Sequence, residues 1–444
     1  MSGNTLNSAQ GRLRGRPVYV VDGLRTPFLK TRGGPGPFHA SDLSLAASRA
    51  LLMRLALTPD KLDQVVLGCV SSGPDEANIA RVVALRLGCD EKVPAWTVQR
   101  NCASGMQALE SAALDIATGR SEMVLAGGTE SMSHHPVLLN DLMVAWLGAW
   151  SQARTLGARG RALMQLRARH FKPVIALLRG LTDPVVGLSM GQTAEELAER
   201  FDIGRDDMDA YAVRSHQRLA SAYENGWMDE IEPLYDGAGS VYEQDDGLRP
   251  DSSMEALAKL RPVFDRQIGR VTAGNSAQVT DGAAMLLLAS EAAVEKHALP
   301  VLGRIVDSQW AGLDPAQMGL GPVHAMAPLM QRHALDSGDV DVWEINEAFA
   351  AQVIACERAW QSDEFCRDVL GTEHAFAPID EARLNVDGGG ISLGHPVGAS
   401  GARITLHALK VMQRHGQRIG MASLCIGGGQ GGALLLEGIE GGAA

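Results

Sequence analysis

Apolar residues in this chain of 444 residues follow two alternating patterns, short runs typical of buried strands and longer runs with helical spacing. Residues 57–67 and 335–345 resemble one another, and each combines the end of a helix, a turn and a short buried strand. Helical patterns follow at 106–118 and 402–415, and a glycine ends each of them. An apolar strand comes next in both places, at 122–130 and 418–429. This alternation predicts two similar halves with mostly parallel sheets flanked by helices, and the two sheets pack together.

Between the halves lies an insert of different character, residues 132–278. It contains a helical pattern at 193–201, where Thr193 is the predicted N-cap and Glu196 completes a capping box. A second helix is predicted at 205–223, and we interpret the insert as a lid or substrate domain. The predicted division is an N-terminal half of residues 1–131 plus 279–300, the insert of 132–278, and a C-terminal half of 301–444.

Residues 141–180 of the insert combine apolar and basic side chains, and Asp141 is their only acidic residue. The basic residues are Arg154, Arg159, Arg161, Arg167, Arg169, Lys172 and Arg179. Apolar positions with helical spacing are Leu142, Trp146, Ala149, Trp150 and Ala153. The run is too short to cross a bilayer, but a basic amphipathic helix suits a membrane surface or a partner protein. The alternative is a helix packed on its own domain, with arginines that are solvated or bind a ligand phosphate.

Charge and cysteine content narrow the class of protein. The net charge of −12 argues against nucleic-acid binding, and 45% apolar with 21% charged residues is typical of a soluble globular protein. Six cysteines contain no C-x-x-C pair, so free thiols in a reducing compartment are expected rather than a zinc site. The first 20 residues lack the apolar stretch of a signal peptide, and we predict a short disordered tail rather than a transit peptide.

Cys102 stands in N-C-A-S-G-M-Q-A, directly before the helical pattern of the first half. A helix N-terminus favours the thiolate, so a lowered thiol pKa is expected there. A single cysteine is more often a small buried hydrophobic residue, and for Cys102 taken alone this alternative stays open. A nucleophilic thiol also needs a base and oxyanion donors.

Three motifs of the second half could supply these groups. His395, in G-G-G-I-S-L-G-H-P-V-G-A-S-G, could take the thiol proton, although a lone loop histidine is more often a surface residue. Cys425 opens C-I-G-G-G-Q-G-G, a turn whose N–H groups could bind an oxyanion or serve only the fold. Asn346, in W-E-I-N-E-A-F-A, could hold a water or carbonyl, cap a helix beginning near Glu347, or do both. Together the motifs indicate acyl transfer through a cysteine thioester, with a second acid/base for breaking a carbon–carbon bond.

In this order the four motifs resemble those of the thiolase family. Further similar segments are A-G-G-T-E-S-M-S at 126–133, M-G-Q-T-A-E at 190–195, T-A-G-N at 272–275 and D-G-A-A at 281–284. The resemblance covers the chain from Val18 onward. It implies an α/β fold with a five-layered α-β-α-β-α core of two similar halves and an inserted loop domain. It also implies CoA-dependent cleavage of 3-ketoacyl-CoA, or the reverse condensation, with no metal or redox cofactor.

The resemblance gives each candidate residue a role. Cys102 is the acyl nucleophile and His395 activates it. Cys425 protonates the departing acetyl-CoA carbanion, or deprotonates acetyl-CoA in synthesis. Backbone N–H groups of Cys102 and Gly427 form one oxyanion hole, and His395 with a water on Asn346 forms the other.

The substrate site departs from the family pattern at three positions. Gln99 stands where asparagine is usual, three residues before the nucleophile. Ser189, beside Met190, replaces a histidine that often lines the acyl pocket, so a restriction to acetoacetyl-CoA is not implied. Ala277 replaces a serine that contacts CoA, and Ser276 comes one position earlier. We therefore expect Ser189, Met190, Ser276 and Ala277 to line the substrate site with an altered pantetheine contact.

The insert and the segment F-C-R-D-V-L-G most resemble the thiolase (β) subunit of trifunctional fatty-acid oxidation complexes. This predicts a degradative thiolase of β-oxidation, and a biosynthetic acetoacetyl-CoA thiolase is the alternative. A decarboxylating ketoacyl synthase on the same fold would lack a second catalytic cysteine, so Cys425 argues against one. A scaffold without activity would carry a broken motif, and none is seen.

The expected partners are CoA thioesters, further copies in a homodimer or homotetramer, a hydratase/dehydrogenase α-subunit, and a membrane touched peripherally through 141–180. No nucleic-acid partner is expected. The expected location is the cytoplasm, and a mitochondrial one stays open. The sequence does not determine the acyl chain length, the physiological direction or the oligomeric state.

Overall fold

The computed structural model describes residue 6 and residues 11–439. Its strands are β1 (Val18–Arg25), β2 (Leu29–Lys30), β3 (Gln64–Gly68), β4 (Ala95–Val98), β5 (Met123–Ser131), β6 (Val137–Leu138), β7 (Val174–Ile175), β8 (Leu234–Tyr235), β9 (Val241–Tyr242), β10 (Thr280–Ser290), β11 (Gly303–Gly312), β12 (Val342–Ile345), β13 (Ile419–Ile426) and β14 (Gln430–Gly438). Its α-helices are α1 (Ala40–Arg54), α2 (Ile79–Leu87), α3 (Ser104–Ala117), α4 (Asp141–Gln152), α5 (Leu156–Gln165), α6 (Ala176–Gly180), α7 (Met190–Arg200), α8 (Arg205–Glu224), α9 (Met254–Leu257), α10 (Glu291–His297), α11 (Gly321–His333), α12 (Ala350–Trp360), α13 (Asp363–Phe365), α14 (Gly390–Leu393) and α15 (Ser400–His415). The helices and strands predicted for both halves are therefore present, within a few residues of the predicted bounds.

Ten strands form one mixed sheet in the order β12-β13-β14-β11-β1-β10-β5-β3-β4, with β2 beside β10. Among the described strands of this sheet, only the pairs β3–β4, β3–β5 and β12–β13 are parallel. The prediction of mostly parallel sheets was wrong for two physical reasons. A glycine turn between Ile426 and Gln430 reverses the chain from β13 into β14. In addition, β10 returns from the insert in the direction opposite to β1 and β5.

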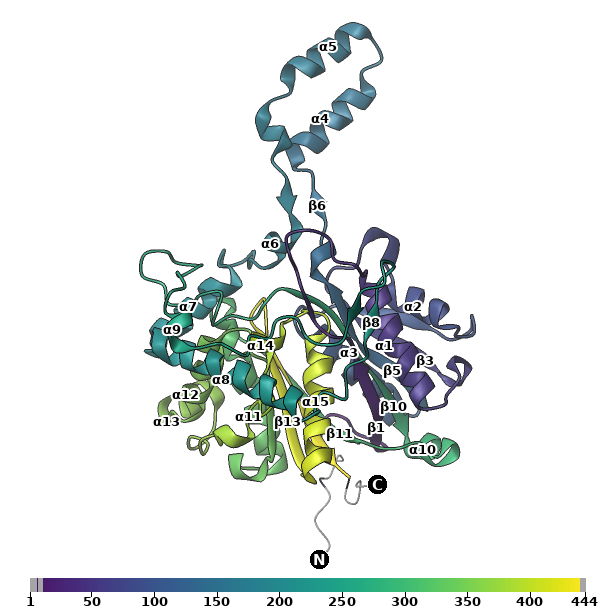
Figure 1. Cartoon of the computed structure of the whole chain (residues 1–444), viewed down its shortest axis with the longest axis vertical. Coiled ribbons are helices and arrows are strands. Elements are labelled where there is room, and N and C mark those ends of the chain that lie inside the picture. The colour runs from purple at the N-terminus through teal and green to yellow at the C-terminus, as the bar shows by residue number, and fades with distance from the viewer. Residues whose placement is uncertain (1–5, 7–10, 440–444) are drawn as a thin grey trace, which may run out of the picture.

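Two central helices, α3 and α15, separate the strands of the two halves (Figure 1). Both helices share one buried apolar cluster with β5 and β10 of the first half and with β13 and β14 of the second. Helices α1 and α2 cover the outer face of the first half, and α11 and α12 cover that of the second. The order of layers is thus α-β-α-β-α, as predicted. The two predicted sheets are joined at one place, where Val18–Val20 of β1 also pair with β11.

Glycines let the two halves meet closely at the N-termini of the central helices. A Cβ atom on Gly128 of β5 would lie 2.0 Å from the carbonyl oxygen of Gly398, and one on Gly105 of α3 would lie 2.8 Å from it. A larger residue at either position would push its own backbone away from the backbone at Gly398. The loops that carry Cys102 and His395 are therefore held in direct contact.

The insert covers the C-terminal half with α7 and α8. Helix α7 begins earlier than predicted: Ser189 is its N-cap, and Ser189 with Gln192 forms the capping box. Thr193 lies inside the helix, where its hydroxyl donates to the carbonyl of Met190 (2.7 Å). The predicted cap at Thr193 was thus wrong, because Ser189 captures the first free N–H groups four residues upstream. The second predicted helix is present as α8.

Residues 137–175, which we call the arm, project from the body as a helical hairpin on a two-stranded stalk (Figure 1). Strands β6 and β7 form the stalk, and α4 packs against α5 at the far end. The indole rings of Trp146 and Trp150 stack with centroids 5.5 Å apart, and Trp146 Nε1 donates to the carbonyl of Ala162 (2.8 Å). The alternative of a helix packed on the body was therefore wrong, but the arginines of the arm are exposed, as that alternative predicted. Within residues 11–439, no helix is long and apolar enough to span a bilayer.

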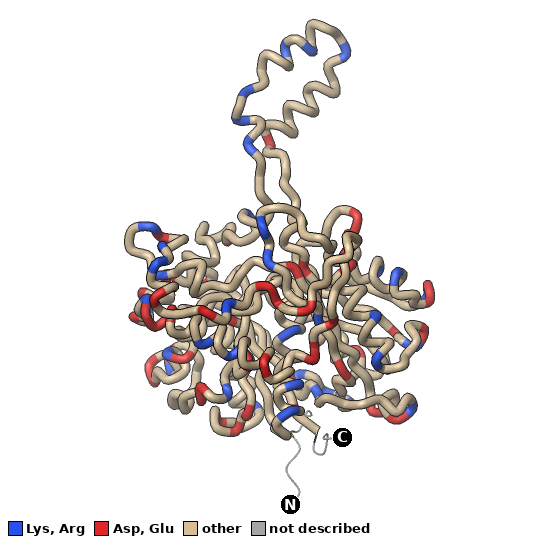
Figure 2. The backbone as a smooth tube through the Cα atoms, viewed as in Figure 1, with Lys and Arg blue, Asp and Glu red and all other residues tan. Residues whose placement is uncertain are grey.

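Basic residues are spread along the arm (Figure 2), and apolar side chains are exposed beside them. Its exposed apolar side chains include Leu142, Val144, Leu147, Leu156, Leu163, Met164 and Phe171. None of its basic residues forms an ion pair with a residue that the structure describes. Positive charge on the arm is therefore not neutralised by the chain itself.

A disordered tail was predicted for the first 20 residues. The residues of this stretch that the structure describes do not form one. Leu13 is buried in the central apolar cluster. The Arg16 guanidinium donates to the carbonyls of Ile116 and Ser121 and pairs with Glu122. These contacts lie at the C-terminal end of α3, so residues 11–17 pack onto the core. Residues 1–5 and 7–10 lie outside the described part of the chain.

Candidate active site

Cys102 lies in a tight turn between β4 and α3. Ser104 Oγ accepts from the N–H of Arg100 (2.9 Å) and donates to the carbonyl of Asn101 (2.7 Å). Asn101 has a φ of 44°, in the left-handed region that asparagine adopts more readily than most residues. The turn places the Cys102 thiol on the wall of a cavity, at the start of the helix.

Burial raises the pKa of the Cys102 thiol above its usual value. The N–H groups of Gly427 and of Cys102 itself face the sulfur and lower the pKa, but they offset only part of the effect. The expectation of a lowered pKa was therefore wrong, because removing the sulfur from water costs the thiolate more than these donors return. The resting group is the neutral thiol, and it needs a base.

The His395 imidazole lines the same cavity. Its Nδ1 lies 2.6 Å from Ser400 Oγ, which itself donates to the carbonyl of Pro396 (3.1 Å). With the Ser400 hydroxyl proton directed at Pro396, Nδ1 carries the imidazole proton and Nε2 keeps its lone pair. Nε2 is buried and has no partner among the described residues. Burial and the charge of Arg403 lower the pKa of His395 to about 4, so the imidazole is neutral near pH 7.

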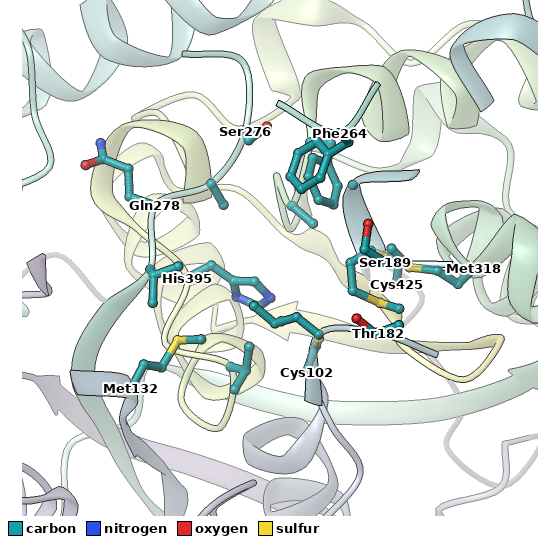
Figure 3. Close-up of a pocket in the computed structure, with 18 of the residues that line it drawn as sticks. Cys102, Met132, Thr182, Ser189, Phe264, Ser276, Gln278, Met318, His395 and Cys425 are labelled. Atoms are coloured by element: carbon teal, nitrogen blue, oxygen red, sulfur yellow. The ribbon is translucent and has the colours of Figure 1, made fainter. Parts of the chain in front are cut away.

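Cys425 is the next-to-last residue of β13 and lines the cavity with Cys102 and His395 (Figure 3). Burial raises its pKa well above the ordinary value, and proximity to Cys102 adds to the shift. Its thiol is therefore protonated at rest and can act as an acid. The glycine turn that follows is tied to the Cys102 loop, because Asn101 Nδ2 donates to the carbonyl of Gly427 (2.7 Å).

Asn346 comes directly after β12 and is fully buried. It does not cap a helix: α12 begins at Ala350, with Phe349 in the N-cap position. That alternative was wrong. Both side-chain atoms of Asn346 lack a partner among the described residues, and the residue is not part of the cavity wall. A buried amide with two free hydrogen-bonding atoms is the kind of group that an internal water satisfies.

The cavity has two lobes that meet at Cys102. The first lobe, of about 300 Å³, contains His395 and Cys425, and the second, of about 470 Å³, contains Gly427 and Gly428. The residues that line both lobes are Cys102, Met132, Leu181, Thr182, Met190 and Val397. All four predicted substrate contacts lie on the wall of the first lobe: Ser189, Met190, Ser276 and Ala277.

Two of these hydroxyls are already engaged with the protein. Ser276 Oγ donates to the carbonyl of Thr272 (2.6 Å). Ser189 Oγ donates to Gln192 Oε1 (3.0 Å) at the start of α7. These two hydroxyl protons are therefore not free to bind a ligand, and the hydroxyls instead stabilise the local fold of the wall.

Sequence reasoning missed the residues that hold these groups in place. Ser400, which positions His395, carries no signal in the sequence beyond its place in G-A-S-G. Glu347 was expected only as the start of a helix. Instead, its carboxylate accepts from Tyr211, Ser215, Asn385 and the N–H of Ile391, and thereby links the Asn346 loop to the His395 loop. An acidic residue directly beside a candidate residue was the available signal.

Family models of known proteins match the two halves of the chain in sequence order. The model of the thiolase N-terminal domain matches residues 18–292, and that of the thiolase C-terminal domain matches residues 299–438. A 3-ketoacyl-CoA thiolase of Yersinia pestis (strain Pestoides F) is 36% identical over 427 residues, which cover 96% of this chain and 97% of that protein.

Solved structures agree. Human mitochondrial 3-ketoacyl-CoA thiolase in complex with CoA is 37% identical, with a TM-score of 0.82 over 96% of this chain and 98% of that one. The acetyl-CoA acetyltransferase of Bacillus anthracis is 35% identical, with a TM-score of 0.80 over 96% of this chain and all of that one (100%). These similarities span both halves and the insert, and the chain belongs to the thiolase family.

Proposed function

We propose that this protein is a 3-ketoacyl-CoA thiolase that cleaves its substrate with CoA to acetyl-CoA and a shortened acyl-CoA, as in fatty-acid β-oxidation. The observation that carries the proposal is one cavity lined by two protonated thiols and a neutral imidazole. One thiol serves as nucleophile, the imidazole as its base and the second thiol as an acid. CoA and its thioesters are the substrates, and these side chains perform each proton transfer themselves.

In the first half-reaction, His395 Nε2 takes the proton from the Cys102 thiol as the sulfur attacks the ketone carbon, C3, of the substrate. The N–H groups of Gly427 and Cys102, which already face that sulfur, are placed to stabilise the resulting oxyanion. The C2–C3 bond then breaks, and its electron pair stays with C2 as the acetyl-CoA enolate. Cys425 gives its proton to C2, which leaves an acyl group on Cys102.

Between the two half-reactions, the proton on His395 passes to the Cys425 thiolate. In the second half-reaction, His395 Nε2 takes the proton of the CoA thiol as its sulfur attacks the acyl-enzyme. The new thioester leaves, and the Cys102 thiolate recovers its proton from His395. A water held by the free amide atoms of Asn346, together with His395 Nε2, would stabilise the enolate oxygen. Each such donor contributes about 3–4 kcal/mol to the transition state.

A series of 3-ketoacyl-CoA substrates from four to sixteen carbons, cleaved with CoA, tests the proposal. We expect cleavage of chains longer than four carbons. Activity confined to acetoacetyl-CoA would instead favour the biosynthetic acetoacetyl-CoA thiolase. No cleavage of any member would refute both.

The separate roles of the two thiols can be tested with Cys425→Ala. This variant should still acquire an acyl group on Cys102 from acyl-CoA, seen as a mass increase of the intact protein. It should not cleave 3-ketoacyl-CoA. Cys102→Ala is the matched control and should fail in both assays. Failure of Cys425→Ala to load would contradict the division of roles.

We also propose that the arm attaches the enzyme peripherally to an anionic membrane surface. Its leucines are exposed, and its basic residues form no ion pair with any residue that the structure describes. These basic residues stand away from an otherwise acidic body (Figure 2). Apolar side chains enter the lipid headgroup region while basic ones pair with phosphates, and each adds to the affinity. A protein α-subunit is the competing occupant.

Vesicle flotation distinguishes these occupants. Phosphatidylglycerol vesicles should carry the enzyme, and neutral phosphatidylcholine vesicles should carry much less. Replacing Leu147, Leu156 and Leu163 of the arm by serine should abolish flotation. The matched control replaces Met53, Val263 and Ile268 of the body, which are 74%, 49% and 83% exposed, and should float normally. Normal flotation of the arm variant would refute the proposal. An enzyme that does not float with vesicles but binds an α-subunit through the arm would favour the protein partner.

Two further proposals concern assembly and location, and resemblance to the thiolases is the only support for the first. We propose a homodimer or homotetramer, to be tested by light scattering during gel filtration. We propose a cytoplasmic location with the membrane contact above, to be tested by fractionation of the producing cells.

A further inference from the structure

We infer that Glu347 is a positioning residue for the enolate step, and that Tyr211 and Ser215 of the insert hold its carboxylate in place. This role rests on the proposed thiolase reaction, in which Asn346 binds the water that stabilises the enolate. It gives helix α8 a part in the chemistry, which the reaction as proposed does not require. It also separates the two chemical steps, because transfer of the acyl group to and from Cys102 needs no enolate.

The side chain of Asn346 has no hydrogen bond to hold it within the described part of the chain. Neither its Nδ2 nor its Oδ1 atom has a partner there. His395 differs, since its Nδ1 lies 2.6 Å from Ser400 Oγ and its backbone N–H donates to the carbonyl of Gln278 (3.0 Å). The direction of the Asn346 amide therefore depends on the atoms that pack against it.

The N-terminal end of helix α14 supplies that packing. A Cβ atom on Gly390 would lie 2.8 Å from the carbonyl oxygen of Glu347 and 3.4 Å from Asn346 Oδ1. A Cβ atom on Gly389 would lie 2.5 Å from the carboxyl carbon of Glu347. The start of α14 is thus seated directly on residues 346 and 347. A shift of this helix end would change the space around the Asn346 amide.

The Glu347 carboxylate ties this end of α14 in place. Its Oε2 atom accepts from the N–H of Ile391 (3.2 Å), in the first turn of the helix. Its Oε1 atom accepts from Asn385 Nδ2 (3.1 Å), in the loop that leads to the helix. Both donors are N–H groups, which cannot act as acceptors, so each needs a carboxylate oxygen opposite it. Glu347 is fully buried, and a donor that lost this partner would be left unpaired away from water.

Two hydroxyl groups of α8 hold the same carboxylate from the side of the insert. They are four residues apart and therefore share one face of the helix. Tyr211 Oη donates to Oε1 of Glu347 (3.1 Å), and Ser215 Oγ donates to Oε2 (2.7 Å). Ser215 Oγ also accepts from the N–H of Gly389 (3.3 Å), the N-cap of α14. Neither Tyr211 nor Ser215 lines either lobe of the cavity, so they act on the reaction only through Glu347 and α14.

Loss of this arrangement should affect the two chemical steps unequally. Acyl transfer uses Cys102 and His395, and the contacts that fix the His395 imidazole and backbone N–H do not include Glu347. Cleavage of the C2–C3 bond uses in addition the water on Asn346. A displaced Asn346 amide would leave the enolate oxygen with one donor fewer, and removing one such donor slows a reaction about 100- to 1,000-fold. Partial displacement should slow cleavage less, but in the same selective way.

The test compares carbon–carbon cleavage with acyl exchange in the same variants. Thiolysis of a six-carbon 3-ketoacyl-CoA breaks the C2–C3 bond and passes through the enolate. Exchange of isotopically labelled CoA into hexanoyl-CoA passes only through the acyl group on Cys102. The Cys102 sulfur displaces CoA from the thioester, and labelled CoA then displaces the Cys102 sulfur. No carbon–carbon bond forms or breaks in the exchange.

Glu347→Gln keeps the size of the side chain, but whichever way its amide turns, the NH2 group faces an N–H donor. We expect it to lower kcat of thiolysis at least about 10-fold while the exchange rate changes less than about 2-fold. Ser215→Ala should lower thiolysis at least about 5-fold with the same selectivity, and Tyr211→Phe should act in the same direction. Ser308→Ala is the matched control, because the buried Ser308 Oγ donates to the buried Glu110 carboxylate (2.6 Å), and it should change neither rate.

The ratio of thiolysis to exchange decides the outcome. If Glu347→Gln and Ser215→Ala lower both rates by the same factor, or lower neither, the inference is overturned and these residues serve only the fold. Ser215→Ala removes a single hydroxyl, so it keeps the test decisive where Glu347→Gln fails to fold. A wild-type enzyme that exchanges CoA but cleaves no 3-ketoacyl-CoA would remove the proposed function itself. An active enzyme with an unaltered ratio would remove only the role of Glu347 and α8.

Discussion

Replacing Ser400 by alanine tests whether His395 acts as a neutral base with its lone pair on Nε2. The Ser400 hydroxyl is the partner of His395 Nδ1 at 2.6 Å, in a fully buried setting. Without it, either the Nδ1 proton stays unpaired or the proton moves to Nε2, where it blocks proton transfer from Cys102. An unpaired buried donor costs about 1–3 kcal/mol. If that cost falls on the reactive arrangement, kcat/KM drops about 5- to 150-fold, since about 1.4 kcal/mol is a factor of ten.

Two measurements follow the effect. Steady-state thiolysis gives kcat/KM, and the rate at which iodoacetamide alkylates Cys102 near pH 7 reports how easily its thiol loses a proton. Both should fall in Ser400→Ala. Ser48→Ala is the matched control, because Ser48 is a buried serine of α1 whose hydroxyl has no partner among the described residues. It should change neither rate.

The reasoning fails if Ser400→Ala keeps the wild-type alkylation rate at neutral pH while its melting temperature falls. In that case Ser400 would support only the fold of the loop. An unchanged kcat/KM would likewise show that the tautomer of His395 is set by some other contact.

Three further predictions concern packing and pH. Gly128→Ala should destabilise the protein by about 3 kcal/mol or more in denaturant unfolding, because its Cβ would meet the Gly398 carbonyl, whereas Gly73→Ala, with open space around it, should change stability by less than about 1 kcal/mol. Because the pKa of His395 is about 4, kcat/KM should stay level through pH 6.5 and fall only as pH approaches 4; a fall centred at 6.5 would show an exposed imidazole. Glu230 and Asp387 raise the pKa of His407 to about 10 against burial, so its contribution to stability is complete below pH 6.5 and is lost as pH rises toward 10. The melting temperature should decline across that window, and less steeply in His407→Gln; equal slopes would contradict the charged state of His407.

The sequence was sufficient for those features that repeat locally. The pattern at 106–118 and 402–415 predicted both central helices, because apolar spacing and a closing glycine are local signals. The five layers followed from resemblance and were confirmed. The strand directions were not, because the pairing of β1 with β10 brings together residues more than 250 positions apart. The division of the chain into domains stays a prediction.

The candidate site was predictable as a set of residues but not as an electrostatic environment. Motif order predicted that Cys102, His395 and Cys425 share a site, and the structure places all three on one cavity wall. The sign of the shift at Cys102 could not be read from its position before a helix, since it depends on how much water the whole fold removes. The arm was visible only as composition, because nothing in residues 141–180 states that the hairpin stands clear of the body.

The origin of the reactive groups has a consequence for the independence of the halves. The proposed nucleophile belongs to the first half, whereas the proposed base and acid belong to the second. The glycine contacts at 105, 128 and 398 leave no gap between the two halves. Neither fragment, expressed separately, holds a complete set of reactive groups. A chain cut in the loop between α10 and β11 should thus be inert in either piece and regain turnover on mixing, so that catalysis itself reports reassembly.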